Sequence, residues 1–345
     1  MRRENPIADL PGGAFFPTGS LTRSMNPKAK SSIKRIAGGT LVRIVRPLRE
    51  IRGLDWLVSH AFQVWYELPV TPTHFYSPLP NISALKGNLH RWYREESLAG
   101  IQMDLPRQQA FVQSLEIYRS ECEQLPRVEQ VTAQGYGLGY GEVEAQFLHS
   151  LIRHFKPRKI IEVGSGVSTC YSLHSLEVNR QVAGIDSDMI CVEPYPKPNL
   201  RKLAAEKKVT VYAQQVQDVG SQLFEQLGQG DILFVDSSHA SKVDSDVNFL
   251  YFGVLPKLQK GVVVHIHDIP FPYLTCPPDH PMFEKSLLWN EAALLRAFLM
   301  WNGTFEILMC QSYLHLKCQE AIKKAIAIYD PSRHFPSSLW MQKVG

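Results

Sequence analysis

The sequence lacks any paired-cysteine motif. Its six cysteines stand at positions 122, 170, 191, 276, 310 and 318, and no two of them have the Cys-x-x-Cys spacing. Most lie in apolar stretches typical of strands or helices, which favours reduced, buried thiols over a disulfide framework or a zinc site. This use of cysteine is typical of a cytoplasmic protein, and we expect that location.

Long apolar runs are also missing. No stretch reaches 18 apolar residues, so we predict no membrane span. The opening "MRRENPIADLPGG" has the charge of a signal peptide, but no apolar stretch follows it. The net charge is only +4, and residues 1–67 carry eleven Lys/Arg against five Asp/Glu, so the rest of the chain is slightly acidic. We therefore predict no nucleic-acid partner.

The N-terminal region is where the positive charge gathers. Residues 1–75 are predicted to be a basic arm, partly disordered and partly helical. Arginines recur there at every third position, Arg43, Arg46, Arg49 and Arg52. This pattern fits a basic amphipathic helix that contacts an anionic membrane surface or a partner, although Pro47 interrupts it. A solvated basic helix packed on the body explains the same pattern.

Strands and helices alternate in the second half of the chain. After a helical lead-in over residues 76–142, which ends in the glycine loop "GYGLGYGE", residues 143–318 alternate apolar strands with amphipathic helices. This alternation predicts a parallel sheet with helices on both faces. "TFEILMC" and "YLHLKC" are separated only by Gln311 and Ser312, which predicts a final antiparallel pair. Residues 319–345 are predicted to be a C-terminal tail.

The predicted fold is thus α/β, a Rossmann-like doubly wound sheet, mostly parallel with a terminal antiparallel strand. The stretch "IIEVGSGVST" places a glycine turn after its first strand. The third glycine of a dinucleotide fingerprint is replaced by Thr169, and the Gly-Lys-Ser/Thr of a phosphate loop is missing. Gly164 and Gly166 let the backbone approach a ligand closely, and the next helix, opened by Ser168 or Thr169, favours an anion at its N-terminus.

This turn, with five alternating strands and a final hairpin, resembles the class I methyltransferases that use S-adenosylmethionine. The resemblance implies a set of cofactor-binding residues: Glu162, Gly164, Ser165, Gly166, Ser168, Thr169, Glu193, Asp218 and Asp236. The acid that binds the ribose hydroxyls has two candidates. Asp186 has the more usual spacing from the turn. Glu193 follows the segment with the clearer strand pattern and is preferred, but the choice between the two acids stays open.

The resemblance extends over about residues 72–318. "THFYSPLPN", "RKIIEVGSGVST", "VEPYP", "DILFVDSSH", "HDIPFP" and "WNEAALL" together resemble one bacterial family of that class, related to macrolide-sugar O-methyltransferases and cephalosporin hydroxylase-like proteins. The resemblance implies the fold and the cofactor. It points to O-methylation of a hydroxyl on a small-molecule or glycan acceptor, such as a sugar or a secondary metabolite.

Acidic and imidazole side chains follow the fourth and fifth predicted strands. In such a sheet, ligands bind at the carboxyl ends of the strands. Asp236 and His239 follow one strand, and His267 and Asp268 close the next. We predict these four as the catalytic residues, with His239, at a pKa near neutrality, as first choice to remove the acceptor's proton. His265 is expected to be buried in the sheet.

A divalent metal is a further possibility. Related enzymes hold magnesium on acids after these two strands, and Asp236 and Asp268 match two of those positions. His267 stands where another acid is usual, which favours other metals over magnesium. The proline-rich segment after Asp268 is predicted to be a lid, with Phe271, Tyr273 and Phe283 covering the acceptor. Asn290 and Glu291, in the next predicted helix, could reach the same pocket or could face solvent.

Two alternatives to a methyltransferase remain. A hydroxylase-like enzyme on the same fold would use iron at the His/Asp cluster. A non-catalytic scaffold would dock through the basic arm. The sequence leaves homo-oligomer formation open.

Overall fold

The computed structural model describes residues 80–278, 280 and 288–345. The basic arm over residues 1–75, with its arginine pattern, and Phe283 lie outside the described residues. The chain divides into two compact units, Met1–Asn81 and Ile82–Gly345, and the described helices and strands belong to the second. Within the described ranges, no helix is both long and apolar enough to cross a membrane.

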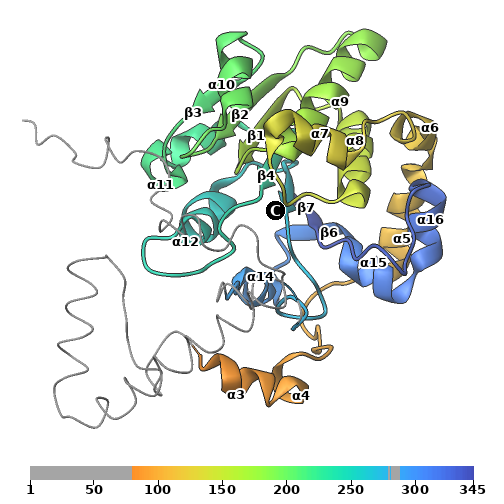
Figure 1. The fold of residues 1–345 in the computed structure, drawn as a ribbon, viewed down its shortest axis with the longest axis vertical. Coiled ribbons are helices and arrows are strands. Elements are labelled where there is room, and N and C mark those ends of the chain that lie inside the picture. The colour runs from red at the N-terminus through yellow and green to blue at the C-terminus, as the bar shows by residue number, and fades with distance from the viewer. Residues whose placement is uncertain (1–79, 279, 281–287) are drawn as a thin grey trace, which may run out of the picture. The chain divides into compact units, whose positions relative to one another are not determined.

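One sheet forms the centre of this unit (Figure 1). Its strands within the described residues are β1 (Lys159–Val163), β2 (Asp188–Val192), β3 (Thr210–Tyr212), β4 (Ile232–Val235), β5 (Val263–Ile266), β6 (Phe305–Cys310) and β7 (Leu339–Lys343). The order across the sheet is β3-β2-β1-β4-β5-β7-β6. Strands β1 to β5 pair in parallel, and β7 runs antiparallel to both β5 and β6. The predicted α/β, Rossmann-like fold is confirmed.

The predicted hairpin after Gln311 and Ser312 is wrong. Gln311–Lys317 form helix α15, and the reversed strand is β7, which inserts between β5 and β6 instead of lying at the edge. The alternation of Leu314 and Leu316 with polar residues resembles a strand, but seven residues are too few to separate the two periods. Ser312 is held by the carbonyl oxygens of Ile269 and Phe271, at 3.0 and 2.8 Å, which fixes the chain at this bend. The expected tail, 319–345, contains helix α16 and β7.

Helices cover both faces of the sheet. The described helical elements are α3 (Ile82–Lys86), α4 (Leu89–Trp92), α5 (Leu105–Ser114), η1 (Glu116–Tyr118), α6 (Arg119–Cys122), α7 (Val128–Val131), η2 (Thr132–Tyr136), α8 (Glu142–Phe155), α9 (Val167–Ala183), α10 (Pro198–Ala205), α11 (Val216–Val219), η3 (Ser221–Gln226), α12 (Asp246–Asn248), η4 (Phe249–Val254), η5 (Leu255–Lys257), α14 (Glu291–Leu299), α15 (Gln311–Lys317) and α16 (Gln319–Ala325).

The alternation of side chains along each strand creates two separate cores. In β1, Ile160 packs with α5, α8, α9, α10 and α16, whereas Ile161 packs on the other face with η3, η4 and α14. Strands covered on both sides are mostly apolar, which explains the apolar run Ile160–Val163, interrupted only by Glu162. All six cysteines are free thiols, and four of them are buried.

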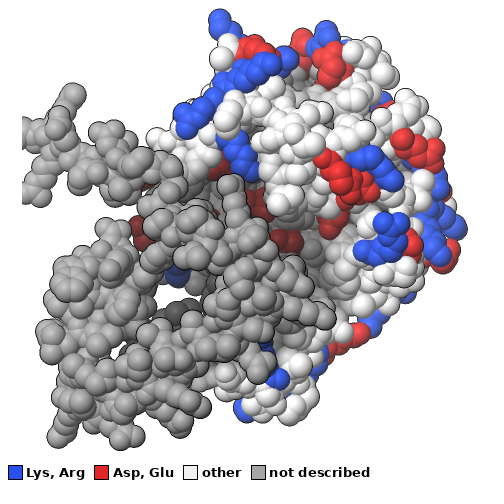
Figure 2. Space-filling model, viewed as in Figure 1, with Lys and Arg blue, Asp and Glu red and all other residues white. Residues whose placement is uncertain are grey.

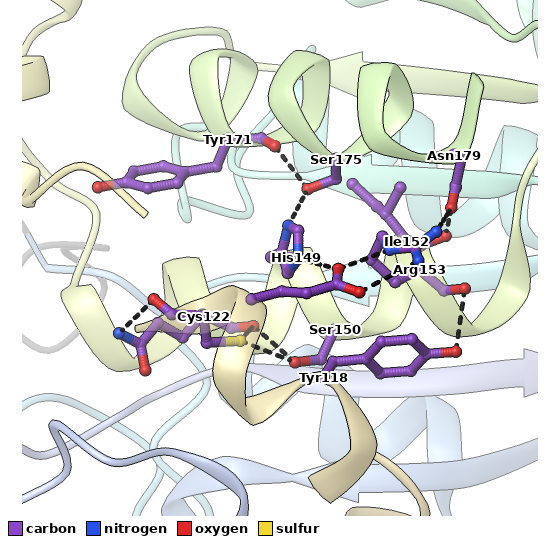
Figure 3. A network of polar contacts seen from close by, with 11 residues as sticks. Tyr118, Cys122, His149, Ser150, Ile152, Arg153, Tyr171, Ser175 and Asn179 are labelled. Carbon is purple, nitrogen blue, oxygen red and sulfur yellow. Dashed lines mark hydrogen bonds and ion pairs between the residues drawn. The ribbon is translucent and has the colours of Figure 1, made fainter. Parts of the chain in front are cut away.

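A buried polar network ties α6 and α8 to α9, the helix that starts at the glycine turn (Figure 3). The fully buried His149 contacts Ser175 Oγ at 2.9 Å and Glu121 Oε2 at 3.0 Å. Arg153 binds the same Glu121 carboxylate at 2.7 Å and also contacts Asn179 of α9. Burial lowers the pKa of His149 to about 4 against the opposing effect of Glu121, so the imidazole is neutral near pH 7. The network thereby fixes α9 on α8.

Candidate active site

The glycine turn packs directly on the neighbouring strand end. Gly164 has a φ of +80°, and a Cβ at this position would collide with the backbone carbonyl of Asp236. The turn is also fixed by backbone bonds from Gly164 N to Val192 O at 3.0 Å and from Asp236 N to Val163 O at 2.9 Å. Glycine is therefore required here by the adjoining backbone, whereas the sequence suggested that it makes room for the cofactor.

Three predicted cofactor residues bind one another beneath the turn. Glu162 is fully buried and accepts hydrogen bonds from Ser168 Oγ at 2.7 Å and Thr169 Oγ1 at 2.5 Å. Burial raises the pKa of Glu162 to about 7, against the lowering effect of these hydroxyls. Thr169 Oγ1 in turn accepts from Gly166 N at 3.0 Å. These side chains shape the turn and the first turn of α9.

Glu193 lies at the carboxyl end of β2. Its two carboxylate oxygens accept hydrogen bonds from Ser165 N at 3.2 Å and Tyr195 N at 2.8 Å. Asp186 precedes the first residue of β2, so it lies at the opposite edge of the parallel sheet. Of the two acids, Glu193 is the one that lines a cavity next to Gly164. This geometry favours the choice of Glu193 as the ribose-binding acid.

Two adjoining cavities surround the turn. The larger, of about 410 Å³, lies over the ends of β1, β2 and β4, and the smaller, of about 140 Å³, lies against the start of α9. Both are lined by Gly164, Glu193 and Asp236. Gln215, Val216 and Gln217 line the larger cavity after β3, while Asp218 of α11 is exposed and is not one of the residues that line it. The sequence prediction named Asp218 and did not name its three cavity-lining neighbours.

The residue types around these cavities fit S-adenosylmethionine. Glu193 offers carboxylate lone pairs for a diol, and the turn and the N-terminus of the 17-residue α9 offer backbone groups. Ser237 Oγ in the larger cavity is buried and makes no hydrogen bond within the described part of the chain. A buried hydroxyl without a partner costs free energy, so a bound ligand would relieve it.

His239 lies at the centre of three carboxylates. Its Nδ1 is 2.8 Å from Glu291 Oε2, and its Nε2 is 3.3 Å from Asp236 Oδ1 and 3.6 Å from Asp268 Oδ2. His239 and Asp268 adopt positive φ values of 55° and 54°, which non-glycine residues rarely do. Such backbone strain is typical of functional sites. The predicted convergence of the two strand ends is therefore seen in the structure.

His239, Asp236, Asp268 and Glu291 form one cluster. Its charge state differs from the neutral base that was expected at His239. Burial of His239 favours its neutral form, but Asp236 and Glu291 outweigh burial and raise the pKa of His239 well above its usual range. Burial also opposes ionisation of Asp236, yet His267 and His239 lower the pKa of that carboxyl. Both shifts favour an imidazolium at His239 and a carboxylate at Asp236. The direction of the shift differs from the near-neutral pKa expected for His239.

His267 joins the cluster to two other elements. Its Nε2 is 3.7 Å from Asp268 Oδ1 and 3.2 Å from the carbonyl oxygen of Gly139, and its Nδ1 is 3.3 Å from Ser338 Oγ. Burial lowers the pKa of His267, but Asp268 and Asp236 outweigh it and raise that pKa. Asp268 accepts a further hydrogen bond from Ser337 Oγ at 3.1 Å. The residues that precede β7 therefore support the cluster.

His265 is buried in the sheet, as expected. Its ring stacks on Phe234 with the centroids 4.1 Å apart and contacts Trp340 at 4.6 Å. Burial lowers the pKa of His265 well below its usual range, so it is neutral. His265 belongs to the core and not to the reacting groups.

Among the described residues, no group of three or more His, Cys, Asp or Glu side chains has a geometry suited to a metal ion. His239 Nε2 lies between the Asp236 and Asp268 carboxylates, the two predicted metal ligands. The metal stays a prediction.

Of the expected lid residues, Phe271 is fully buried in the core, and Tyr273 stacks on Tyr93 with the centroids 4.8 Å apart. Trp289, which sequence reasoning missed, contacts the His239 ring at 4.7 Å.

One family of known proteins matches the middle of the chain. Residues 161–269 match a family described as a methyltransferase domain. An uncharacterised protein of Archaeoglobus fulgidus is 28% identical over 172 residues, which cover 47% of this chain and 75% of that protein.

Two solved structures are similar at low identity. The O-methyltransferase TomG from Streptomyces achromogenes, involved in tomaymycin synthesis and solved with SAM, is 14% identical with a TM-score of 0.39, over 71% of this chain and 92% of that one. The O-methyltransferase from Bacillus cereus, solved with SAH, is 14% identical with a TM-score of 0.38, over 68% of this chain and 100% of that one.

Residues 161–269 therefore carry a methyltransferase domain, and the strand order of the sheet is that of the class I methyltransferase fold.

Proposed function

We propose that the protein transfers the methyl group of S-adenosylmethionine to a hydroxyl of a small acceptor, a sugar or a secondary metabolite. The observation that carries the proposal is the position of His239, with its Nε2 3.3 Å from Asp236 and 3.6 Å from Asp268, beside the cofactor cavities. An oxygen acceptor must lose a proton during methylation, and this cluster offers carboxylates to take it.

The roles within the cluster follow from charge and position. S-Adenosylmethionine supplies an electrophilic methyl group on sulfur. Asp268, which lines the opening beside Trp289, receives the proton of the acceptor hydroxyl as the oxygen–methyl bond forms and the sulfur–methyl bond breaks. His239, as an imidazolium held by the buried Glu291, orients Asp236 and Asp268. This arrangement aligns the acceptor oxygen and removes its proton without a large rearrangement.

Apolar side chains next to the cluster could form one wall of the acceptor site. Trp289, Cys276 and Leu274 line a space of only about 10 Å³ with His239 and Asp268, so a ring-shaped acceptor requires this space to open. An aromatic side chain next to a proton-transfer group can stack on the face of a sugar or an aromatic ring. Asp236 and Asp268 are also the residues that would hold a divalent metal, if one takes part.

The test uses radiolabelled methyl transfer. The protein is incubated with methyl-labelled S-adenosylmethionine and panels of sugar, phenolic, amine and carboxylate acceptors. We expect transfer to hydroxyl acceptors, and a roughly 100-fold or greater loss of rate in Asp268→Asn with unchanged affinity for S-adenosylhomocysteine. Transfer confined to nitrogen or carbon acceptors, or full activity in the Asp268 variant, would refute the proposal. Parallel assays with EDTA decide whether a metal takes part.

A further inference from the structure

The glycine-rich loop "GYGLGYGE" at residues 135–142 forms one wall of the smaller cavity. Tyr136, Leu138, Gly139 and Tyr140 face the turn Gly164–Gly166 across this space. The loop is in close contact with the turn, because a Cβ on Gly166 would lie 3.0 Å from the carbonyl oxygen of Tyr136. The loop thus closes the end of the cofactor site next to α9.

The start of α10 holds this loop in place. Lys197 Nζ donates a hydrogen bond to the carbonyl oxygen of Tyr136 at 3.4 Å, and Asn199 Nδ2 donates to that of Gln134. Gly137 has a φ of +102°, and a Cβ at that position would collide with Lys197 Nζ. The glycine therefore lets the lysine ammonium reach the rim of the cavity.

The smaller cavity has more negative than positive side chains in its lining. Its lining includes the carboxylates of Glu193 and Asp236 and the ammonium of Lys197. Within the part of the chain that the structure describes, no carboxylate lies within ion-pair distance of Lys197, although α10 and the segment that follows it carry further lysines paired with Glu206. Figure 2 shows Lys and Arg side chains over the region where Figure 1 places α10 and β3.

The amino-acid end of S-adenosylmethionine carries a sulfonium and an ammonium, both positive, and one carboxylate. The positive groups suit the carboxylate of Asp236, since Glu193 is assigned to the ribose, while the α-carboxylate needs a cation. We propose that Lys197 binds the α-carboxylate of S-adenosylmethionine while its ammonium also fastens the glycine-rich loop over the methionine part. The proposal rests on the assigned cofactor and is independent of the acceptor.

The experiment compares two ligands that differ only in the carboxylate, S-adenosylmethionine and decarboxylated S-adenosylmethionine. Their dissociation constants are measured by calorimetry for the wild type, for Lys197→Met and for the control Lys202→Met. Lys202 lies on the same helix, and its side chain is 76% exposed. We expect Lys197→Met to weaken S-adenosylmethionine about fivefold to twentyfold, the scale of a charge-assisted hydrogen bond on an exposed side chain. The decarboxylated ligand should be weakened clearly less, because it loses only the contribution of the loop, and Lys202→Met should change neither.

Two outcomes would overturn the role of Lys197. Equal weakening of both ligands would mean that Lys197 acts only through the loop, and unchanged binding of both would mean that it does not contact the cofactor. Lys197→Arg keeps the charge and should retain most of the preference for the carboxylated ligand. A wild-type protein that binds neither ligand would instead overturn the cofactor assignment itself, so the two failures are distinguishable.

Discussion

The Nδ1 atom of His239 lies 2.8 Å from a carboxylate oxygen of Glu291, and both side chains are almost fully buried. Glu291 is the first residue of α14, and the backbone N–H groups of Asn290 and Glu291 also contact the carbonyl oxygen of His239. The imidazole is therefore held from both its backbone and its ring, with Nε2 turned toward Asp236 and Asp268. Asp236 and Glu291 are the two carboxylates that raise the pKa of His239.

Replacement of Glu291 should change the ionisation of His239. Glu291→Gln keeps a hydrogen-bond acceptor but removes a buried negative charge that raises the pKa of His239. The pKa of His239 should therefore fall by about 1 unit or more, roughly the effect of one close charge. Histidine nitrogen NMR shifts recorded against pH measure this directly, with His239→Gln to assign the signal. An unchanged titration would contradict the role of Glu291.

The ionisation of His239 has a defined effect on stability. Because its folded-state pKa lies above its unfolded value, the stabilisation is fully present below about pH 6.5 and is lost as the pH rises through the raised pKa. In Glu291→Gln this loss should begin at lower pH.

Glu193 and Asp186 can be separated by binding measurements. Glu193→Ala should weaken S-adenosylhomocysteine by about 1.5–3 kcal/mol, the contribution of hydrogen bonds to a charged group. Asp186→Ala is the matched control, because Asp186 lies at the other edge of the sheet and should leave the affinity unchanged. Calorimetry at fixed ionic strength gives both values. The reverse pattern would assign the ribose to Asp186.

Gly164 should tolerate no side chain. Gly164→Ala would place a Cβ against the carbonyl of Asp236 and also force a positive φ on alanine. Gly184→Ala, at the end of α9, has a positive φ but no atom within 4 Å of the added Cβ. The control should lose about 1 kcal/mol of stability, whereas Gly164→Ala should lose several times more. Equal losses in chemical denaturation would show that the contact with Asp236 can relax.

The buried Glu162 predicts a pH-dependent stability. Its pKa in the folded protein is raised to about 7, so the neutral form is favoured by folding. The stabilisation is fully present below the unfolded pKa near 4.5 and is lost as the pH rises through 7, a change of about 3 kcal/mol. Glu162→Gln, which stays neutral, should remove this change and be the more stable protein at pH 8. Urea unfolding at pH 5 and pH 8 measures the difference.

The sequence was sufficient to bring the predicted catalytic residues together but not to fix their supports. Asp236 and Asp268 end parallel neighbouring strands, so their convergence follows from topology alone. Glu291 comes 52 residues after His239, and the sequence placed it only in a helix that could reach the pocket or face solvent; its carboxylate reaches the imidazole because α14 packs on that face of the sheet. Ser337 and Ser338 follow no recognisable motif, and their positions depend on β7, which the sequence pattern assigned to another segment. Local patterns contain no information about such tertiary partners.

The insertion of β7 between β5 and β6 has a consequence for the order of folding. Strands β5 and β6 are not paired with each other, so the sheet is continuous only when β7 fills the gap between them. Its partner residues in β5 precede it by more than 70 positions, and contacts of such sequence separation form late and slowly. The same step brings Ser337 to Asp268 and Ser338 to His267. A chain with β7 unpaired could therefore keep its cofactor cavity while its proton-accepting cluster is still incomplete.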